Sequence, residues 1–272
     1  MPSLADHKSQ SYRKLLLLGD AKVGKTSSLI SLVAAGFKLR ILDMDNLIDP
    51  LAEQIKLHCP DKLASVEVVS IRDKWKMTDA GPVLDGVPKA FSTAIKMIDR
   101  WKYDDVDLGV PGNWGPDCIF VLDSLSRFCD AAYNWAEIMT PKGKSGEKHG
   151  QAIYGTGQDG VENTLSTLTS AIFETNLIVI CHGVYMALED GTTKIFPQGI
   201  GQKLSPKIPQ YFPYYVRYIN TGGKRTIQLK SNSMINLATP LGLPDTLPME
   251  TGLATIFKDL QPTKPTKLTR KV

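Results

Sequence analysis

The stretch LLLLGDAKVGKTSSLI, residues 15–30, decides the fold of this chain. Four leucines lead to Gly19, and GDAKVGKT (19–26) fits the phosphate-loop pattern G-x-x-x-x-G-K-[ST] at every fixed position. The leucine run is typical of a buried strand, and residues 25–35 after the loop are typical of a helix that Gly36 ends. Glycines let the backbone wrap closely round a phosphate, whose oxygens the loop N–H groups then bind. The stretch therefore predicts a strand, an anion-binding loop and a helix in that order.

The loop supplies the residue types that a nucleoside triphosphate site needs. Lys25 places a positive charge on the β- and γ-phosphates, and the Thr26 hydroxyl is expected to ligate Mg²⁺. The predicted nucleotide-binding residues are Gly19, Asp20, Ala21, Lys22, Val23, Gly24, Lys25, Thr26 and Ser27. The plainer interpretation is a glycine-rich turn with a surface lysine, but the strand before the loop and the helix after it favour the nucleotide site.

Length and composition indicate one large α/β domain or one domain with a small appendage. The chain has 272 residues, 42% of them hydrophobic, and a formal net charge of +4, which permits an anionic partner without requiring one. The cysteines at 59, 118, 129 and 181 show no C-x-x-C spacing, and Cys118 and Cys181 lie in apolar runs that favour small buried thiols. No run approaches the roughly 18 apolar residues of a membrane span, and no signal peptide is evident. We expect a cytoplasmic protein, in the host cytoplasm if it is phage-encoded.

Apolar strands alternate with helical segments through most of the chain, which predicts a mainly parallel sheet covered by helices on both faces. The expected strands are 13–18, 39–45, 65–71, 118–124 and 176–182, and the expected helices are 25–35, 46–58, 88–102, 125–138 and 161–174. Segments 72–88, 104–116, 140–160 and 186–210 are expected to be loops or irregular. Strands 214–220 and 224–231, joined by Thr221-Gly222-Gly223, predict a C-terminal antiparallel hairpin. We expect a flexible segment at 1–12, one domain at 13–257 and a basic, disordered tail at 258–272.

Acidic residues end two of the predicted strands. Asp123 closes CIFVLD, where an NTPase holds Mg²⁺ through a carboxylate, and parallel strands bring their carboxyl ends to the rim that carries the phosphate loop. The alternative for Asp123 is a cap on the following helix. Asp43 and Asp45 end LRILDMD, where period 2 places them on one side with Met44 opposite, so either could act on the attacking water. His182, after NLIVIC, is either a sensor of the γ-phosphate or a structural histidine.

The order of these motifs resembles the core of RecA-like recombinase ATPases. The likeness rests on the phosphate loop, ILDMDNLIDP (41–50), CIFVLDS (118–124) and LIVICHG (177–183), and covers about residues 13–235. The resemblance implies a RecA-like fold and places the water-activating carboxylate at Asp45, where the family has a glutamate that is one methylene longer. The whole chain resembles most the compact phage-encoded RecA-like ATPases of single-strand annealing and recombination, in which a histidine at the sensor strand is familiar. On this basis Lys25, Asp45 and His182 are the predicted catalytic residues, ATP and Mg²⁺ the ligands, and Thr26 and Asp123 the metal-holding residues.

The resemblance also implies single-stranded DNA as a partner, bound by two loops. FPQGIGQKLSPKIPQYFPYYVRY (196–218) is similar to the region after the second DNA-binding loop of that family. The first loop would be 139–158, with Lys142, Lys144, Lys148 and Tyr154, and the second 185–203, with Tyr185, Lys194, Phe196 and Lys203. Basic residues that follow phosphates and aromatic residues that stack on bases suit binding without sequence preference. Mobile loops with ordinary lysines are the alternative.

Further partners follow from the same resemblance. It implies self-assembly into a ring or filament, in which Lys224 and Arg225 would reach the γ-phosphate of a neighbouring subunit, and a single-strand-binding protein as a further partner. No membrane partner is expected.

Three other function classes remain open on the sequence. A small GTPase would need D-x-x-G and N-K-x-D motifs, but Asp123-Ser124-Leu125-Ser126 does not supply the first and the second is absent. A nucleotide kinase would need an arginine-rich lid, whereas 139–158 holds lysines and no arginine. An ATP-dependent assembly or packaging accessory would bind ATP and hardly hydrolyse it, and the aspartate at position 45 is compatible with that role.

Overall fold

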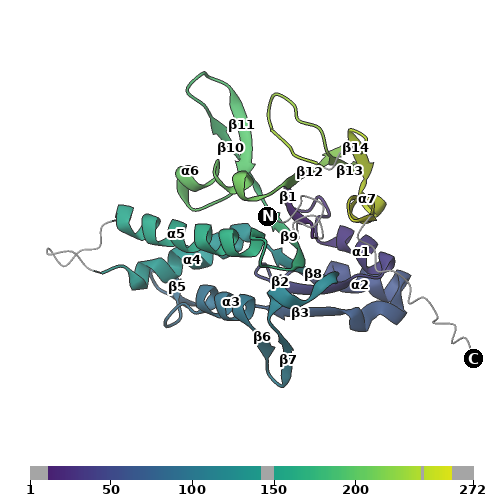
Figure 1. Cartoon of the computed structure of the whole chain (residues 1–272). Coiled ribbons are helices and arrows are strands. Elements are labelled where there is room, and N and C mark those ends of the chain that lie inside the picture. The colour runs from purple at the N-terminus through teal and green to yellow at the C-terminus, as the bar shows by residue number, and fades with distance from the viewer. Residues whose placement is uncertain (1–11, 142–149, 240–241, 259–272) are drawn as a thin grey trace, which may run out of the picture.

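The protein folds around one central sheet of eight strands (Figure 1). The computed structural model describes residues 12–141, 150–239 and 242–258. The strands lie in the order β14 (Thr246–Pro248), β13 (Lys224–Gln228), β12 (Tyr214–Thr221), β1 (Lys14–Gly19), β9 (Thr175–Cys181), β8 (Gly115–Asp123), β2 (Lys38–Asp43) and β3 (Val66–Ser70). Neighbours from β12 to β3 pair in parallel, and β13 and β14 add antiparallel strands at one edge. The predicted fold class is confirmed: an α/β, RecA-like arrangement with a C-terminal antiparallel extension.

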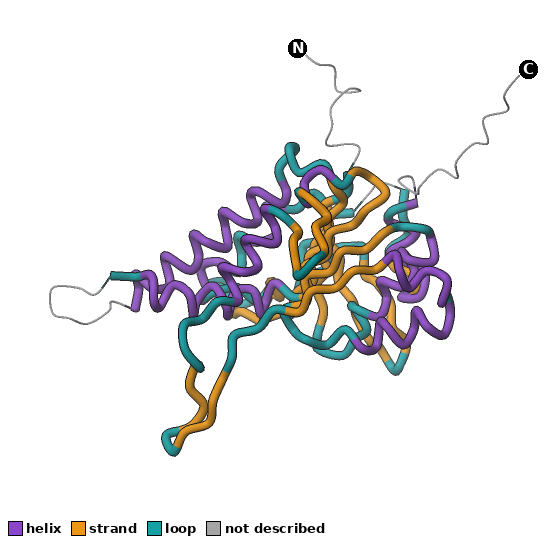
Figure 2. The backbone as a smooth tube through the Cα atoms, turned by 90° about the horizontal axis from the view of Figure 1, so that it is seen from below, coloured by secondary structure: helices purple, strands orange, loops and turns teal. Residues whose placement is uncertain are grey.

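Helices cover both faces of the sheet, and the strands lie between the two groups of helices (Figure 2). One group consists of α1 (Ile30–Ala35), α2 (Asp49–His58) and α7 (Met249–Ile256), and the other of α3 (Ala90–Asp99), α4 (Leu125–Met139) and α5 (Gly150–Thr169). The leucine run explains this layering, because Leu15 and Leu17 pack into the first core and Leu16 and Leu18 into the second. All four leucines are fully buried, as expected for a parallel strand with helices on both sides.

The short elements complete the chain. Two-stranded hairpins are formed by β4 (Trp75–Thr78) with β5 (Gly81–Leu84), β6 (Trp101–Tyr103) with β7 (Val106–Gly109), and β10 (Gly183–Ala187) with β11 (Thr193–Pro197). The β6–β7 and β10–β11 hairpins project from the body on opposite sides in Figure 1. The short helical segments are η3 (Ser27–Leu29), η4 (Pro60–Ser65), η5 (Pro111–Asn113), α6 (Gly201–Leu204) and η6 (Ile208–Tyr211).

The predicted strands and most helices are confirmed to within a few residues, and so is the hairpin at Gly222-Gly223. Gly36 ends α1 with a φ of 102°, as a C-terminal glycine should. The helix after the phosphate loop begins with the 3₁₀ turn η3 rather than directly at residue 25. The four cysteines are free and buried, as expected for small apolar side chains, and burial raises the pKa of the Cys118 thiol to about 11.

Three segments that we expected to be irregular are ordered instead. Segments 72–88 and 104–116 contain hairpin strands whose residues are mostly exposed. Buried and exposed residues do not alternate along these strands as they do in a half-buried strand. Segment 186–210 contains most of the β10–β11 hairpin and α6.

Segment 140–160 was the clearest error, because α5 begins at Gly150. Glycine is a poor helix former, but Gly157 and Gly160 let α5 approach its neighbours closely. A Cβ at Gly160 would lie 3.0 Å from the Phe91 ring, and one at Gly157 would lie 3.1 Å from Ile200. Tertiary packing therefore overrides local propensity in this helix.

The predicted tail at 258–272 and the segment 1–12 fall almost entirely outside the described residues. Among the residues that are described, no helix has both the length and the apolar character that crossing a bilayer requires.

Candidate functional site

The phosphate loop leaves the central strand β1 at Gly19 and turns sharply towards η3. Lys22 and Gly24 have positive φ angles of 62° and 97°, which give the loop its tight path. Both consensus glycines lie against other parts of the chain: a Cβ at Gly19 would lie 2.9 Å from the Cβ of Tyr218, and one at Gly24 would lie 2.7 Å from the sulfur of Met249. A side chain at Gly19 would displace β12, whereas one at Gly24 would push the Met249 side chain aside and be strained by the positive φ. The pattern found in the sequence therefore has a steric basis in this fold.

Lys25 lies under the loop with only 6% of its surface exposed. Its ammonium group donates hydrogen bonds to the carbonyl oxygens of Gly19 and Asp20, at 2.8 and 2.7 Å. Burial lowers the pKa of Lys25, and the negative charges of Asp123 and Asp45 oppose that shift. The side chain is thus held at the loop by two carbonyl groups, and a bound phosphate group could replace these contacts.

Thr26 and Asp123 meet at the rim of the sheet as predicted. The Thr26 hydroxyl donates to Asp123 Oδ2 at 2.6 Å, and Asp123 is the last residue of β8, two strands from β1. Burial raises the pKa of Asp123 to about 6, and the nearby carboxylates of Asp45 and Asp43 add to the shift. A buried carboxylate of this kind is stabilised in its ionised form by a cation.

The donor set of this pair fits Mg²⁺. The ion takes oxygen ligands and usually keeps several waters, so one carboxylate and one hydroxyl beside bound phosphates suffice. In keeping with this, residues 12–141, 150–239 and 242–258 hold no cluster of three or more His, Cys, Asp or Glu side chains that would form a complete metal cage.

Asp45 faces the same cleft and is positioned by side chains from two other strands and a helix. Ser124 donates to Asp45 Oδ1 at 3.0 Å, His182 Nε2 lies 3.7 Å from Oδ2, and Arg127 Nε lies 3.7 Å from Oδ1. Burial raises the pKa of the Asp45 carboxyl, but the contacts with His182 and Ser124 and the charge of Arg127 outweigh it, so that the pKa lies below its ordinary value. Asp45 is therefore ionised at neutral pH and able to accept a hydrogen bond or a proton.

Asp43 has a structural role in this geometry. It is 2% exposed, and its oxygens accept hydrogen bonds from the amides of Asp45 and Asn46 and from the Ser70 hydroxyl. Strand β2 ends at Asp43, so the period-2 argument that placed both acids on one side of a strand does not extend to Asp45. Of the two acids, only Asp45 lines the cleft.

His182 follows β9, the strand between β1 and β8, and lines the cleft together with the phosphate loop and Asp45. Its backbone amide donates to Ser126 Oγ at 3.0 Å, which ties the end of β9 to the first turn of α4. The four neighbouring strands β1, β9, β8 and β2 thus deliver the predicted catalytic and metal-holding residues to one rim. The cleft that they form with the phosphate loop has a volume of about 680 Å³.

Sequence reasoning missed several residues of this cleft. Arg72, Arg127 and Leu47 line it, and Ser124 holds Asp45. Ser124 could have been found in the sequence, because it directly follows the acid at the end of a predicted strand. The arginines could not, because only the fold brings them to the rim. Arg225 lines the cleft of its own chain, with Nη1 3.5 Å from the position of a Cβ on Gly24. Its contact with the γ-phosphate of a neighbouring subunit stays a prediction.

The two expected DNA loops are placed in part. Lys142, Lys144 and Lys148 lie outside the described residues, while Tyr154 lies on α5 with 44% of its surface exposed. In the second loop Tyr185, Lys194 and Phe196 lie on the β10–β11 hairpin and Lys203 lies on α6. The binding role of both segments stays a prediction.

Two comparisons with known proteins find no match, and a third finds a distant structural similarity. No protein-family model matches the sequence, and no curated protein matches it either. Among solved structures, the chain is similar to a prototypical ATPase from the type III secretion system of pathogenic bacteria, with 11% sequence identity and a TM-score of 0.43. The similarity covers 77% of this chain and 52% of that one, so this chain spans about half the length of that ATPase. The arrangement described above, with a phosphate loop after a central strand and acids at the ends of separate parallel strands, has the RecA-like fold class that the sequence predicts.

Proposed function

We propose that this protein binds ATP with Mg²⁺, hydrolyses it, and couples the hydrolysis to single-stranded DNA. The observation that carries the proposal is the convergence of three units in one cleft: Lys25 on the phosphate loop, the Thr26–Asp123 pair, and Asp45 with Ser124 and His182. Each unit has a place in phosphoryl transfer, which depends mainly on positioning and on charge stabilisation. A simple anion site would not need the third unit.

In this mechanism Lys25 and the loop amides bind the β- and γ-phosphates, and Thr26 and Asp123 would hold the metal ion. Bound Mg²⁺ would neutralise charge on the phosphate oxygens. Asp45 accepts a hydrogen bond from a water and takes its proton as the water oxygen bonds to the γ-phosphorus. The bond from that phosphorus to the β–γ bridging oxygen breaks, which yields ADP and phosphate. His182, beside Asp45, is positioned to respond to loss of the γ-phosphate.

The biological setting is part of the proposal. The motif order resembles phage recombination ATPases, and on that basis the protein would assemble into a ring or filament on single-stranded DNA, with a single-strand-binding protein as a further partner. Arg72, Arg127 and Arg225 at the cleft supply the cations that such an assembly could use to sense a nucleotide.

The test is ATP hydrolysis with and without single-stranded DNA, in the wild type and in Lys25→Ala and Asp45→Ala. Lys56→Ala and Glu53→Ala are matched controls, because both side chains are exposed on α2 and neither lines the cleft. The proposal expects DNA-stimulated turnover that both cleft variants lose and both controls keep. ATP binding without turnover in the wild type would instead favour an assembly accessory, turnover only with a nucleoside acceptor would favour a kinase, and a preference for GTP would favour a GTPase.

A further inference from the structure

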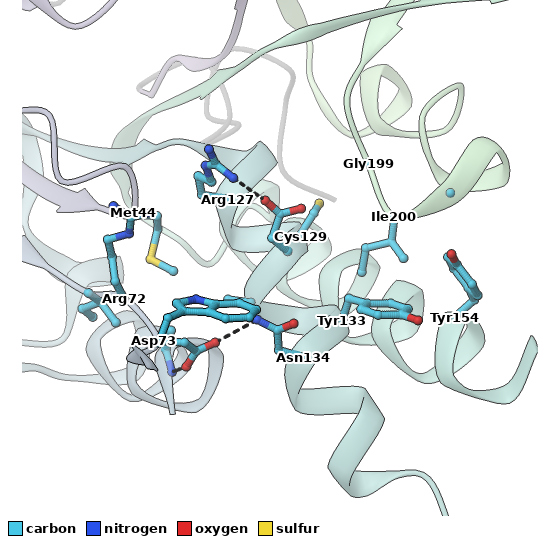
Figure 3. A pocket seen from close by; sticks show the side chains of 16 residues that line it. Met44, Arg72, Asp73, Arg127, Cys129, Tyr133, Asn134, Tyr154, Gly199 and Ile200 are labelled. Carbon is cyan, nitrogen blue, oxygen red and sulfur yellow. Dashed lines mark hydrogen bonds and ion pairs between the residues drawn. The ribbon is translucent and has the colours of Figure 1, made fainter. Parts of the chain in front are cut away.

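A second cavity lies beside the nucleotide cleft and has aromatic walls (Figure 3). We call it the aromatic pocket; its walls come from Trp75 on β4, Tyr133 and Asn134 on α4, and Tyr154 on α5, and residues 199–201 add to the lining. Its volume of about 410 Å³ falls in the roughly 300–1,000 Å³ range of small-molecule pockets. None of these residues takes part in the mechanism above.

The aromatic pocket and the nucleotide cleft share two walls, Arg72 and Arg127, which line both cavities. In Figure 3 Arg72 lies towards one end of the pocket and Tyr133 and Tyr154 towards the other, with Arg127 on α4 between them. Arg127 also forms an ion pair with Asp130 at 3.0 Å and lies 3.7 Å from Asp45. Arg72 is exposed, and no ion pair joins its side chain to any residue that the structure describes.

The aromatic rings offer flat faces to an incoming ligand. Tyr133 and Tyr154 pack with their centroids 5.1 Å apart and their planes inclined at 53°. Trp75 and Tyr154 nevertheless keep 57% and 44% of their surfaces exposed. Two large exposed rings at the mouth of one cavity are unusual for surface that has no binding role, because burying an aromatic ring is strongly favourable.

A fixed polar group completes the wall. Asn134 Nδ2 donates to Asp73 Oδ2 at 3.2 Å, and Asp73 Oδ1 in turn accepts from the amides of Lys89 and Ala90 at the start of α3. The Asn134 amide is therefore anchored through the scaffold, and such an amide can pair with the polar edge of a planar ring.

Stacking faces, an anchored amide and two cations match the chemistry of a nucleotide within a strand. We propose that the aromatic pocket binds one unstacked base of single-stranded DNA, with the adjoining phosphates on Arg72 and Arg127. Trp75 and Tyr154 supply the stacking faces, which accept any base. The pocket also lies where the two segments predicted to face DNA meet, since Tyr154 belongs to the first and residues 199–201 to the second. This inference rests on the proposed function and names the place where the strand acts.

Arg127, which lines both cavities, connects the aromatic pocket to the catalytic residues. A strand phosphate at Arg127 competes with Asp45 for the guanidinium group, which lies within 4 Å of that carboxylate already. Binding of a base in the pocket would therefore change the environment of the proposed water-activating carboxylate. Stimulation of hydrolysis by DNA is the expected consequence.

The test uses the full chain and a short oligothymidylate that carries one 2-aminopurine, whose fluorescence falls when the base stacks. The variants are Trp75→Ala and Tyr154→Ala, with Trp75→Phe as the conservative change and Tyr103→Ala as the matched control. Tyr103 is a similarly exposed aromatic residue, 52% exposed, on the β6–β7 hairpin outside the pocket. We expect the two pocket variants to bind the oligonucleotide at least about fivefold more weakly, as loss of one base–aromatic stack implies, and to lose its stimulation of hydrolysis. Basal hydrolysis without DNA should stay at the wild-type level, and Trp75→Phe and Tyr103→Ala should retain binding.

Two results would overturn the inference, and they differ from failure of the proposed function. If both Trp75→Ala and Tyr154→Ala bind the oligonucleotide and quench its fluorescence normally, the strand binds elsewhere and the inference is wrong. The proposed function would still hold in that case if DNA stimulates hydrolysis by the wild type. Competition by thymidine monophosphate as effective as that of the oligonucleotide would make the pocket a mononucleotide site. If the wild type neither hydrolyses ATP nor binds the oligonucleotide, the proposed function and this inference both fail.

Discussion

The hydroxyl of Thr26 and the carboxylate of Asp123 lie 2.6 Å apart although 97 residues separate them in the chain. Strand β9 lies between the two strands that deliver them, so the contact depends on the sheet order and on the loop reaching over β9. Asp123 pairs in register with Asp43 on β2, and its carbonyl accepts a hydrogen bond from the Met44 amide at 2.5 Å. The burial of Asp123 and the repulsion of its carboxylate by those of Asp45 and Asp43 therefore destabilise its ionised form.

We predict that Asp123→Asn makes the protein more stable at neutral pH while abolishing turnover. The pKa of Asp123 is raised from 3.8 to about 6, so the folded state binds more protons than the unfolded state between these values, and its stability falls as pH rises through that window. At pH 7 the penalty is on the order of 2–3 kcal/mol. Chemical unfolding should show the asparagine variant more stable by up to that amount at pH 7 and no more stable near pH 4. Equal stability of the two proteins at pH 7 would contradict the burial argument.

Ser124 allows a test of how Asp45 is positioned. Its hydroxyl donates to Asp45 Oδ1 and accepts from the Arg127 amide, so it serves both the site and the N-terminus of α4. Ser124→Ala removes a hydrogen bond that lowers the pKa of Asp45, so the acid limb of the hydrolysis pH profile should move to higher pH. We expect turnover to fall by about tenfold, part of the roughly 10²–10⁴ that a general base contributes. Loss of the cap should cost about 1 kcal/mol of stability.

The matched control for this change is Ser124→Thr, which keeps the hydroxyl and should keep the profile. A fall in turnover with an unmoved acid limb would show that Ser124 acts through stability alone.

The sequence predicted the features that leave a local pattern in the chain and missed those that depend on contacts between distant segments. The phosphate loop and Asp123 were found because they are local patterns on buried strands, and strands buried on both faces are continuous apolar runs. The choice of Asp45 rather than Asp43 as the water-activating carboxylate came from the resemblance. Their hydrogen bonds now distinguish the two acids, because Asp43 accepts from backbone amides whereas Asp45 accepts from the Ser124 hydroxyl. The contribution of Arg72, Arg127 and Trp75 to the cavities had no local signal, because it depends on where α4 and the β4–β5 hairpin lie against the sheet. The first half of helix α5, residues 150–160, was missed for the opposite reason, since its glycines gave a strong but misleading local signal.

The glycines of α5 separate packing from propensity. Nothing lies within 4 Å of a Cβ built on Gly155, whereas a Cβ on Gly160 would lie 3.0 Å from the Phe91 ring. Gly155→Ala should therefore raise the free energy of unfolding by roughly 0.5–1 kcal/mol, the helical preference of alanine over glycine. Gly160→Ala should gain nothing or lose stability because Phe91 must shift. Urea unfolding of both variants measures the contrast, and equal gains in the two would show that α5 is not packed as closely as described.

Lys14 gives the protein a second pH-dependent element, remote from the cleft. Its ammonium group is buried beneath β9, donates to the carbonyls of Phe173 and Thr175 at 2.5 and 2.7 Å, and lies 4.5 Å from the centre of the Phe173 ring. Burial lowers its pKa from 10.5 to about 7, so the unfolded state binds more protons than the folded state between these values, and this group's effect on stability becomes more favourable as pH rises through that window.

Comparison with Lys14→Met isolates this effect. Between pH 7 and pH 9.5 the unfolding free energy of the wild type should rise relative to that of the variant by on the order of 2–3 kcal/mol. Urea unfolding of both proteins at the two pH values measures the difference, and Lys56→Met, at an exposed lysine on α2, is the control that should show no such change. If the difference in unfolding free energy between wild type and Lys14→Met is the same at both pH values, Lys14 keeps its ordinary pKa in the folded state. Its ammonium group would then be hydrated, which contradicts its buried hydrogen bonds to Phe173 and Thr175.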